Sequence, residues 1–84
     1  METNQKIHQE YAEEFKSMTD KELVDAFNRQ VGNNGWVGRK MIYIHALHME
    51  FENRSYDYSV IGNMGGISLK NRIELIGKKI LITK

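Results

Sequence analysis

The chain of 84 residues is 40% hydrophobic and 27% charged, and its formal net charge is +1. These values are typical of one small globular domain covering residues 1–84 and exclude most specialised compositional classes. The chain contains no cysteine, which excludes disulfides and thiolate metal sites and fits a reducing, cytoplasmic setting. No stretch approaches the roughly 18 apolar residues of a membrane span, and the first residues are unlike a signal peptide, so we expect no export and no membrane insertion.

Charge is distributed unevenly along the chain. Residues 1–27 contain three Lys against seven Asp or Glu, whereas residues 28–84 contain nine Lys or Arg against four Asp or Glu. This polarity suits head-to-tail self-contact or an acidic partner at the basic end. Ordinary solvated surface is the simpler explanation of the same pattern.

Residues 4–18 are predicted to form the first helix. Apolar residues recur there at steps of four, four and three, which places them on one helical face. They are Ile7, Tyr11, Phe15 and Met18.

A second helix is predicted for residues 20–31. Thr19 and Glu22 have the spacing of a capping box, in which each side chain bonds the backbone N–H of the other residue. The segment Gly32-Asn33-Asn34-Gly35 then predicts the end of the helix, because Gly and Asn tolerate left-handed backbone angles. The apolar positions that keep helical spacing are Leu23, Val24, Phe27 and Val31.

A third helix, residues 36–53, is expected to organise the core. Its apolar arc is formed by Trp36, Val37, Tyr43, Ile44, Leu47 and Phe51. The opposite, mixed edge is formed by Gly38, Met41, His45, His48 and Glu52. Since both histidines lie on that edge, we expect them to face solvent.

The pattern changes to a period of two after Arg54, which predicts β segments at residues 56–61, 67–76 and 79–83. Gly77-Lys78 fits a two-residue type II′ hairpin turn that pairs Ile76 with Lys79. The same register pairs Leu75 with Ile80, Ile73 with Ile82 and Glu74 with Leu81. A helix over residues 68–80, with Ser68 as N-cap, is the alternative, but Gly77 would cost it about 1 kcal/mol relative to alanine.

These elements predict an α+β fold, in which three N-terminal helices pack on a small antiparallel β-hairpin or three-stranded sheet. The spacing of His45, His48 and Glu52 permits a metal ligand set, but a solvated helix edge explains the three residues better. No nucleophile elbow or phosphate-loop motif occurs in the sequence. We therefore expect no enzyme, cofactor, metal or small-molecule substrate.

The leading functional hypothesis is a small non-catalytic protein-interaction or regulatory module that binds another protein or itself. Large adaptable side chains motivate it, together with five methionines and an edge strand at residues 79–83 open to strand addition or dimerisation. The candidate contact residues are Trp36, Tyr56, Tyr58 and Met64.

The alternative is a winged-helix-like nucleic-acid-binding protein, with a helix-turn-helix at residues 20–53 and a basic hairpin as the wing. Its candidate contact residues are Asn33, Asn34, Arg39, Lys40, Arg72, Lys78 and Lys79. The apolar start of the third helix, the acidic Glu50 and Glu52 in it, and a pI of about 8.0 all argue against this alternative.

Overall fold

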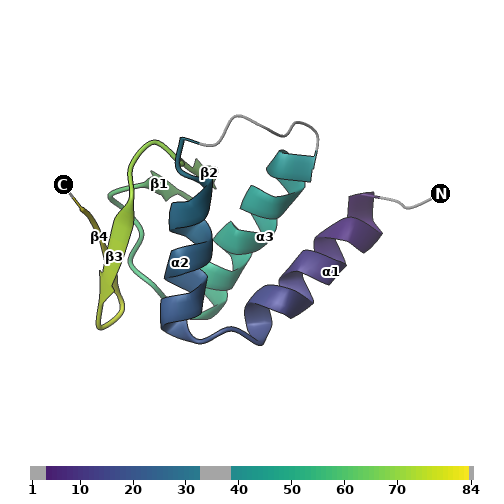
Figure 1. The fold of residues 1–84 in the computed structure, drawn as a ribbon, viewed down its shortest axis with the longest axis horizontal. Helices are drawn as coiled ribbons and strands as arrows, with labels where there is room; N and C mark the ends of the chain where they lie inside the picture. Colours follow the sequence, from purple (N-terminus) through teal and green to yellow (C-terminus); the bar gives the residue numbers. More distant parts are fainter. Residues whose placement is uncertain (1–3, 33–38, 84) are drawn as a thin grey trace.

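The computed structural model describes residues 4–32 and 39–83, which form three helices followed by two β-hairpins (Figure 1). The helices are α1 (Asn4–Lys16), α2 (Asp20–Gln30) and α3 (Arg39–Asn53). The strands are β1 (Gly62–Asn63), β2 (Gly66–Ile67), β3 (Ile73–Ile76) and β4 (Lys79–Ile82). The predicted α+β arrangement, with helices first and hairpins after them, is confirmed. No helix in the described part of the chain is long and apolar enough to cross a membrane.

The hairpins form two separate two-stranded antiparallel sheets. The β3–β4 hairpin packs through β3 against α2, the β1–β2 hairpin contacts α3 through β2, and α1 packs along α3 (Figure 1). A third strand at residues 56–61 is not formed. Asp57 instead makes an isolated parallel bridge to Lys79, and a turn follows at residues 59–61.

The strand predicted at residues 56–61 is wrong because the end of α3 sets the path of the chain there. Ser55 has a φ of 60°, Ser55 N–H donates to the Glu52 carbonyl, and Tyr56 N–H reaches back to the Phe51 carbonyl. These two bonds define a Schellman motif, and the ring contact between Tyr56 and Phe51, 5.5 Å between centroids, supplies its hydrophobic clasp. The chain leaves the helix in a direction fixed by this cap.

The β3–β4 hairpin has the predicted register throughout, from Ile73 opposite Ile82 to Ile76 opposite Lys79. Gly77 has a φ of 62°, whereas Lys78 is not among the described residues with positive φ, as a type II′ turn requires. The alternative helix over residues 68–80 is therefore wrong. The predicted strand 67–76 is also too long, since residues 68–72 form a loop between β2 and β3.

Helix α2 is joined to β3 by a side chain that takes the place of a neighbouring strand. The Asn28 amide donates to the Ile73 carbonyl at 2.9 Å and accepts from the Ile73 N–H at 2.7 Å. The predicted capping box is present at the other end of α2, with Thr19 and Glu22 bonding each other's backbone N–H.

The core lies between the three helices and the β3–β4 hairpin. Its largest fully buried side chains are Phe15, Phe27, Phe51, Leu23, Leu47, Ile73 and Ile80. Within α3, burial is concentrated between Ala46 and Phe51, while Tyr43 and Ile44 are half-buried. Trp36 and Val37, predicted in the same arc, lie outside the described residues.

Candidate functional site

A hollow of about 420 Å³ lies between the outer face of α3 and the β1–β2 turn. It is lined by Met41, Ile44, His45, His48, Met49, Glu52, Met64, Gly65, Gly66 and Ile67. An adjoining hollow, which shares Met41 and His45, extends to Gln5, His8 and Ile42. We call the residues that line the two hollows the methionine surface.

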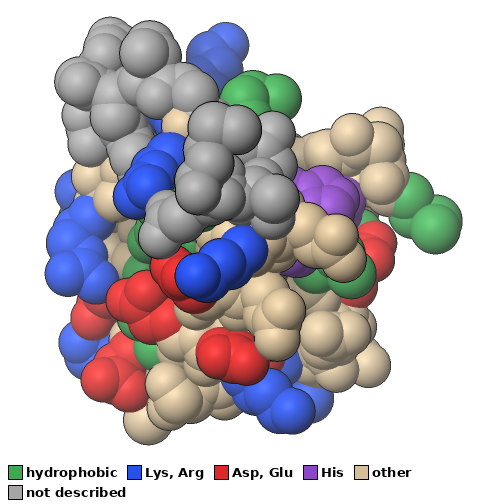
Figure 2. Space-filling model, turned by 90° about the vertical axis from the view of Figure 1, so that its right-hand side faces the viewer, with side chains coloured by type: hydrophobic (Ala, Val, Ile, Leu, Met, Phe, Trp, Pro, Cys, Tyr) green, Lys and Arg blue, Asp and Glu red, His purple; other side chains and the backbone are tan. Residues whose placement is uncertain are grey.

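Helical spacing and a tight turn assemble the methionine surface. Met41, His45 and Met49 follow one another at steps of four, so they lie along one face of α3. Met64 is carried to the same place by the β1–β2 turn, because β2 contacts α3. Met41 is 74%, Met49 41% and Met64 87% exposed. Three apolar side chains therefore stand in water around one hollow, and Figure 2 shows a hydrophobic side chain protruding beside the histidines.

His48 and Glu52, which line the hollow, form a hydrogen-bonded trio with Tyr58. The Tyr58 hydroxyl donates to Glu52 Oε1 at 2.6 Å, and His48 Nε2 lies 2.9 Å from the same hydroxyl oxygen. Because the hydroxyl has only one proton, His48 Nε2–H must be the donor of the second bond. The carboxylate of Glu52 holds the tyrosine proton and raises the pKa of Tyr58 to about 12.

The burial of His48 corrects the prediction that both histidines face solvent. His48 is 5% exposed, because Tyr58 packs edge-on against its ring with centroids 5.0 Å apart, while His45 stays exposed. Helical periodicity could not reveal this contact, since Tyr58 comes from the chain beyond the Schellman motif.

His45 pairs instead with His8 of α1. His8 Nε2 and His45 Nδ1 are 2.8 Å apart, so one ring must donate a proton and the other must accept it. Burial, and then the neighbouring His45, lower the pKa of His8 below its ordinary value. No group of three or more His, Asp or Glu side chains in the described ranges is arranged to hold a metal ion.

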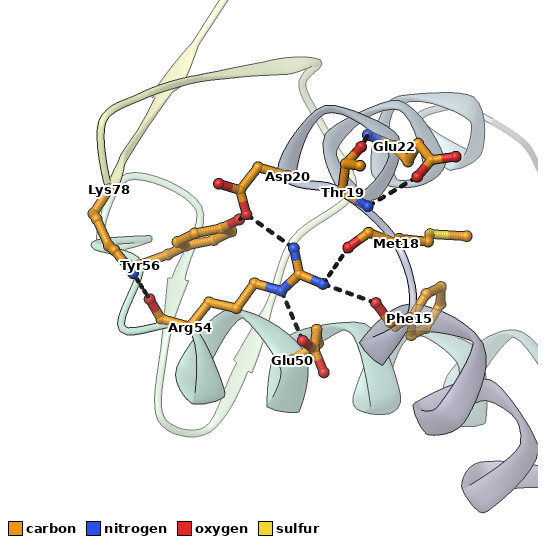
Figure 3. A network of polar contacts seen from close by, with 9 residues as sticks. All are labelled: Phe15, Met18, Thr19, Asp20, Glu22, Glu50, Arg54, Tyr56 and Lys78. Atoms are coloured by element: carbon orange, nitrogen blue, oxygen red, sulfur yellow. Dashed lines mark hydrogen bonds and ion pairs between the residues drawn. The ribbon is translucent and has the colours of Figure 1, made fainter.

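Arg54, which directly follows α3, bonds to α2, to α3 and to the end of the α1 segment (Figure 3). Its Nε donates to Glu50 Oε2 at 2.7 Å and its Nη1 to Asp20 Oδ1 at 2.9 Å. Its Nη2 donates to the carbonyls of Phe15 and Met18, which end the α1 segment. The Phe15 carbonyl lies in the last turn of α1 and the Met18 carbonyl two residues beyond it, so Arg54 holds the chain where α1 ends. The helix stops at Lys16 rather than at the predicted residue 18.

Two further groups complete this network. The Tyr56 hydroxyl donates to Asp20, and this bond, followed by that from Arg54, lowers the pKa of Asp20. Burial alone would lower the pKa of Arg54, but its bonds to Glu50 and Asp20 outweigh burial and raise it. Lys78 Nζ donates to the Arg54 carbonyl at 2.8 Å. The bonds of Arg54 all run to other segments of the same chain, which indicates a structural role for the network.

The residues predicted to contact a protein partner are dispersed. Met64 is exposed at the methionine surface, and Tyr58 lies beneath it against His48. Tyr56 is 5% exposed and belongs to the core, and Trp36 lies outside the described residues. The prediction did not include Met41 and Met49, although their spacing around His45 is visible in the sequence.

The residues of the nucleic-acid alternative do not form one patch. Arg39 and Lys40 begin α3, whereas Lys78 bonds the end of the same helix. Fifteen helical residues separate these sites by about 21 Å, and the β3–β4 turn lies at the other end of the molecule from the start of α3 (Figure 1).

The remaining candidate residues for nucleic-acid binding do not extend a basic patch. Arg72 lies in the 68–72 loop and lines a hollow shared with Glu22 and Asp25, and Lys79 is exposed beside the turn of the hairpin. Asn33 and Asn34 lie outside the described residues. Basic and acidic side chains are mixed on the face drawn in Figure 2.

Comparison with known proteins finds no relative of this chain. No protein-family model matches the chain, and neither the curated proteins nor the solved structures contain a match.

Proposed function

We propose that this protein is a small non-catalytic interaction module that binds a protein partner through the methionine surface. The observation that carries the proposal is the gathering of three exposed methionines around one hollow. Among the described residues that line it, only Glu52 carries a formal charge. Exposed apolar surface of this kind is costly to keep in water unless a partner covers it. Methionine suits such contacts because its flexible thioether adapts to different shapes. The proposal includes the cytoplasmic setting expected from the sequence.

Site-specific photo-crosslinking in the cells that produce the protein tests this proposal. A photoreactive residue at position 64 should give one dominant covalent adduct with a protein, and Met49→Glu should abolish it. The matched control places the same residue at position 76, because Ile76 is 61% exposed on the β3–β4 hairpin, away from the methionine surface. Equal adducts from both positions, or none from position 64, would contradict the proposal.

Nucleic-acid binding is the second candidate, favoured by the order α2, α3 and a hairpin bearing Lys78 and Lys79. The argument against nucleic-acid binding is the surface of α3, the helix that would have to enter a groove of the nucleic acid. The exposed face of α3 presents Met41, His45 and Met49, and its second half is largely buried.

Fluorescence anisotropy with a random duplex at 50 and 200 mM salt separates the two functions. Under the leading proposal, no binding is expected at either salt concentration. Tight binding that falls steeply with salt, and that Lys78→Glu with Lys79→Glu weakens, would favour the second candidate.

A further inference from the structure

We infer that His8, His45 and Met41 form a binding site for a monovalent copper ion, Cu(I), at the junction of α1 and α3. The inference goes beyond the proposed function, which rests on apolar contact and needs no metal. No sequence motif links the two histidines, because they are 37 residues apart in the chain. Only the packing of α1 along α3 brings them together.

The first argument is the way in which the two imidazoles meet. His8 Nε2 and His45 Nδ1 are 2.8 Å apart, although the ring centroids are 4.9 Å apart and the ring planes are inclined by 52°. The rings therefore approach through their nitrogen atoms and do not stack. Two imidazole nitrogens that each bind one ion at about 2.0 Å, with an angle of about 110–120° between the bonds, stand about 3.3–3.5 Å apart. A separation of the rings by about 0.5–0.7 Å therefore lets both nitrogens bind the same ion.

The two helices hold the pair in place without a metal. The rings of Tyr11 and Phe15 on α1 both pack edge-on against Tyr43 on α3, with centroids 5.1 and 5.0 Å apart. Tyr11 lies one helical turn after His8, and Tyr43 lies two residues before His45. His8 is half-buried and His45 is exposed, so the rings keep room for a small rotation. The backbone on both sides of the site is thus fixed, and the ligands can adjust.

Met41 supplies the third donor atom and determines the class of metal. It precedes His45 by four residues, so both side chains lie on one face of α3. Met41, His8 and His45 line the same hollow of about 450 Å³. Met41 is 74% exposed, and its flexible side chain is free to turn its sulfur toward the imidazoles. A thioether is a soft ligand that selects Cu(I), and imidazole also suits copper.

Charge favours a monovalent ion over a divalent one. The other described residues that line this hollow are Gln5 and Ile42, so its described lining contains no carboxylate. Two neutral imidazoles and a thioether leave a net charge of +1 around Cu(I) and +2 around Zn²⁺, and an uncompensated charge is costly beside apolar side chains. Structural zinc sites also usually take four ligands. The donor set of the site therefore fits Cu(I) better than zinc.

Binding of the ion changes the tautomer of one ring and no oxidation state. In the free protein one of the two facing nitrogens donates its N–H to the other. When the ion binds, the donor ring must hold its hydrogen on its other nitrogen, so that both facing nitrogens present lone pairs. The hydrogen bond between the rings is exchanged for two bonds to the ion, which remains Cu(I).

Titration of the full chain with Cu(I), under nitrogen and with ascorbate, against the chromophoric chelator bicinchoninate tests the site. The chain should withdraw one ion from the chelator. His8→Gln and His45→Gln should each lower the affinity at least tenfold, and Met41→Leu should lower it as well. Circular dichroism checks that the variants fold, which we expect of His45→Gln because His45 is exposed.

The matched control is Met49→Leu, because Met49 is also exposed on α3 but does not line the hollow of the two histidines. This variant should bind the ion as the wild type does. A wild type that withdraws no copper, or an affinity that falls as much in Met49→Leu as in Met41→Leu, would overturn the inference.

NMR with Ag(I), a redox-inert ion of the same charge, locates the ligands. The imidazole resonances of His8 and His45 and the methyl resonance of Met41 should shift, while that of Met18 stays in place. Unchanged imidazole resonances, or tighter binding of Zn²⁺ than of Cu(I), would overturn the assignment. Crosslinking from position 64 involves neither histidine, so a failed copper site leaves the proposed function standing, and a failed crosslink leaves the copper site standing.

Discussion

Arg54 shows how one side chain joins segments that are far apart in the sequence. Its side chain is 16% exposed, and its guanidinium bonds two carboxylates and two carbonyls from three segments of the chain. Such a group is favourable only while its partners stay paired, because a buried carboxylate left alone has lost its solvation and its counter-charge. Glu50, 8% exposed, is that carboxylate here.

Replacing Arg54→Met should therefore lower the free energy of unfolding by about 2–4 kcal/mol. Urea denaturation followed by circular dichroism measures the loss. The control is Lys21→Met, which removes an exposed ion pair to Asp25 and should change stability by less than about 0.5 kcal/mol. Equal effects of the two variants would show that the network contributes little.

Ser55 is a residue in a conformation better suited to glycine. Its φ of 60° is required by the Schellman motif, and an L side chain at this angle is strained. Ser55→Gly should raise the free energy of unfolding by about 0.5–1 kcal/mol, since the relief of strain exceeds the added freedom of the unfolded chain. Ser59→Gly, where φ is not positive, should lower stability instead. A destabilising Ser55→Gly would refute this account of the cap.

At the scale of elements, the β1–β2 hairpin depends on a close approach between its strands. A Cβ atom at Gly62 would overlap the Gly66 carbonyl and the Ile67 Cα. Gly62→Ala should therefore distort the turn and cost at least about 1 kcal/mol. Methyl NMR would show the Met64 resonance shifting while that of Met18 stays in place. Gly65→Ala is the milder comparison, because its Cβ would meet only the Asn63 side chain.

The junction of α1 with α3 should respond to pH through His8. Its pKa is lowered in the folded protein, so the unfolded chain binds the proton more readily. The contribution of His8 to stability is then complete above the unfolded pKa of about 6.5 and is lost as the pH falls through the lower folded value. Urea midpoints at pH 7.5, 6.5 and 5.5 should decline for the wild type and decline less for His8→Gln. Parallel declines would contradict this linkage.

Local interactions made the helices and the second hairpin predictable. The capping box at Thr19 and the turn at Gly77 are complete within a few residues, so their sequence signals suffice. The burial of His48 and the short β1–β2 hairpin arise from contacts with Tyr58 and α3, which no local pattern contains. The sequence shows only the part of the methionine surface that lies on α3, because Met64 reaches that helix through tertiary folding.

At the scale of the whole molecule, the bonds between Asn28 and Ile73 affect whether copies of the protein can aggregate through the β3–β4 hairpin. A hairpin with open margins is a template on which further copies can polymerise into fibres. Asn28 occupies the outward amide and carbonyl of Ile73 on one margin, and Asp57 takes the N–H of Ile80 on the other. Both edges of the hairpin are thereby partly blocked, which disfavours the addition of strands from further copies.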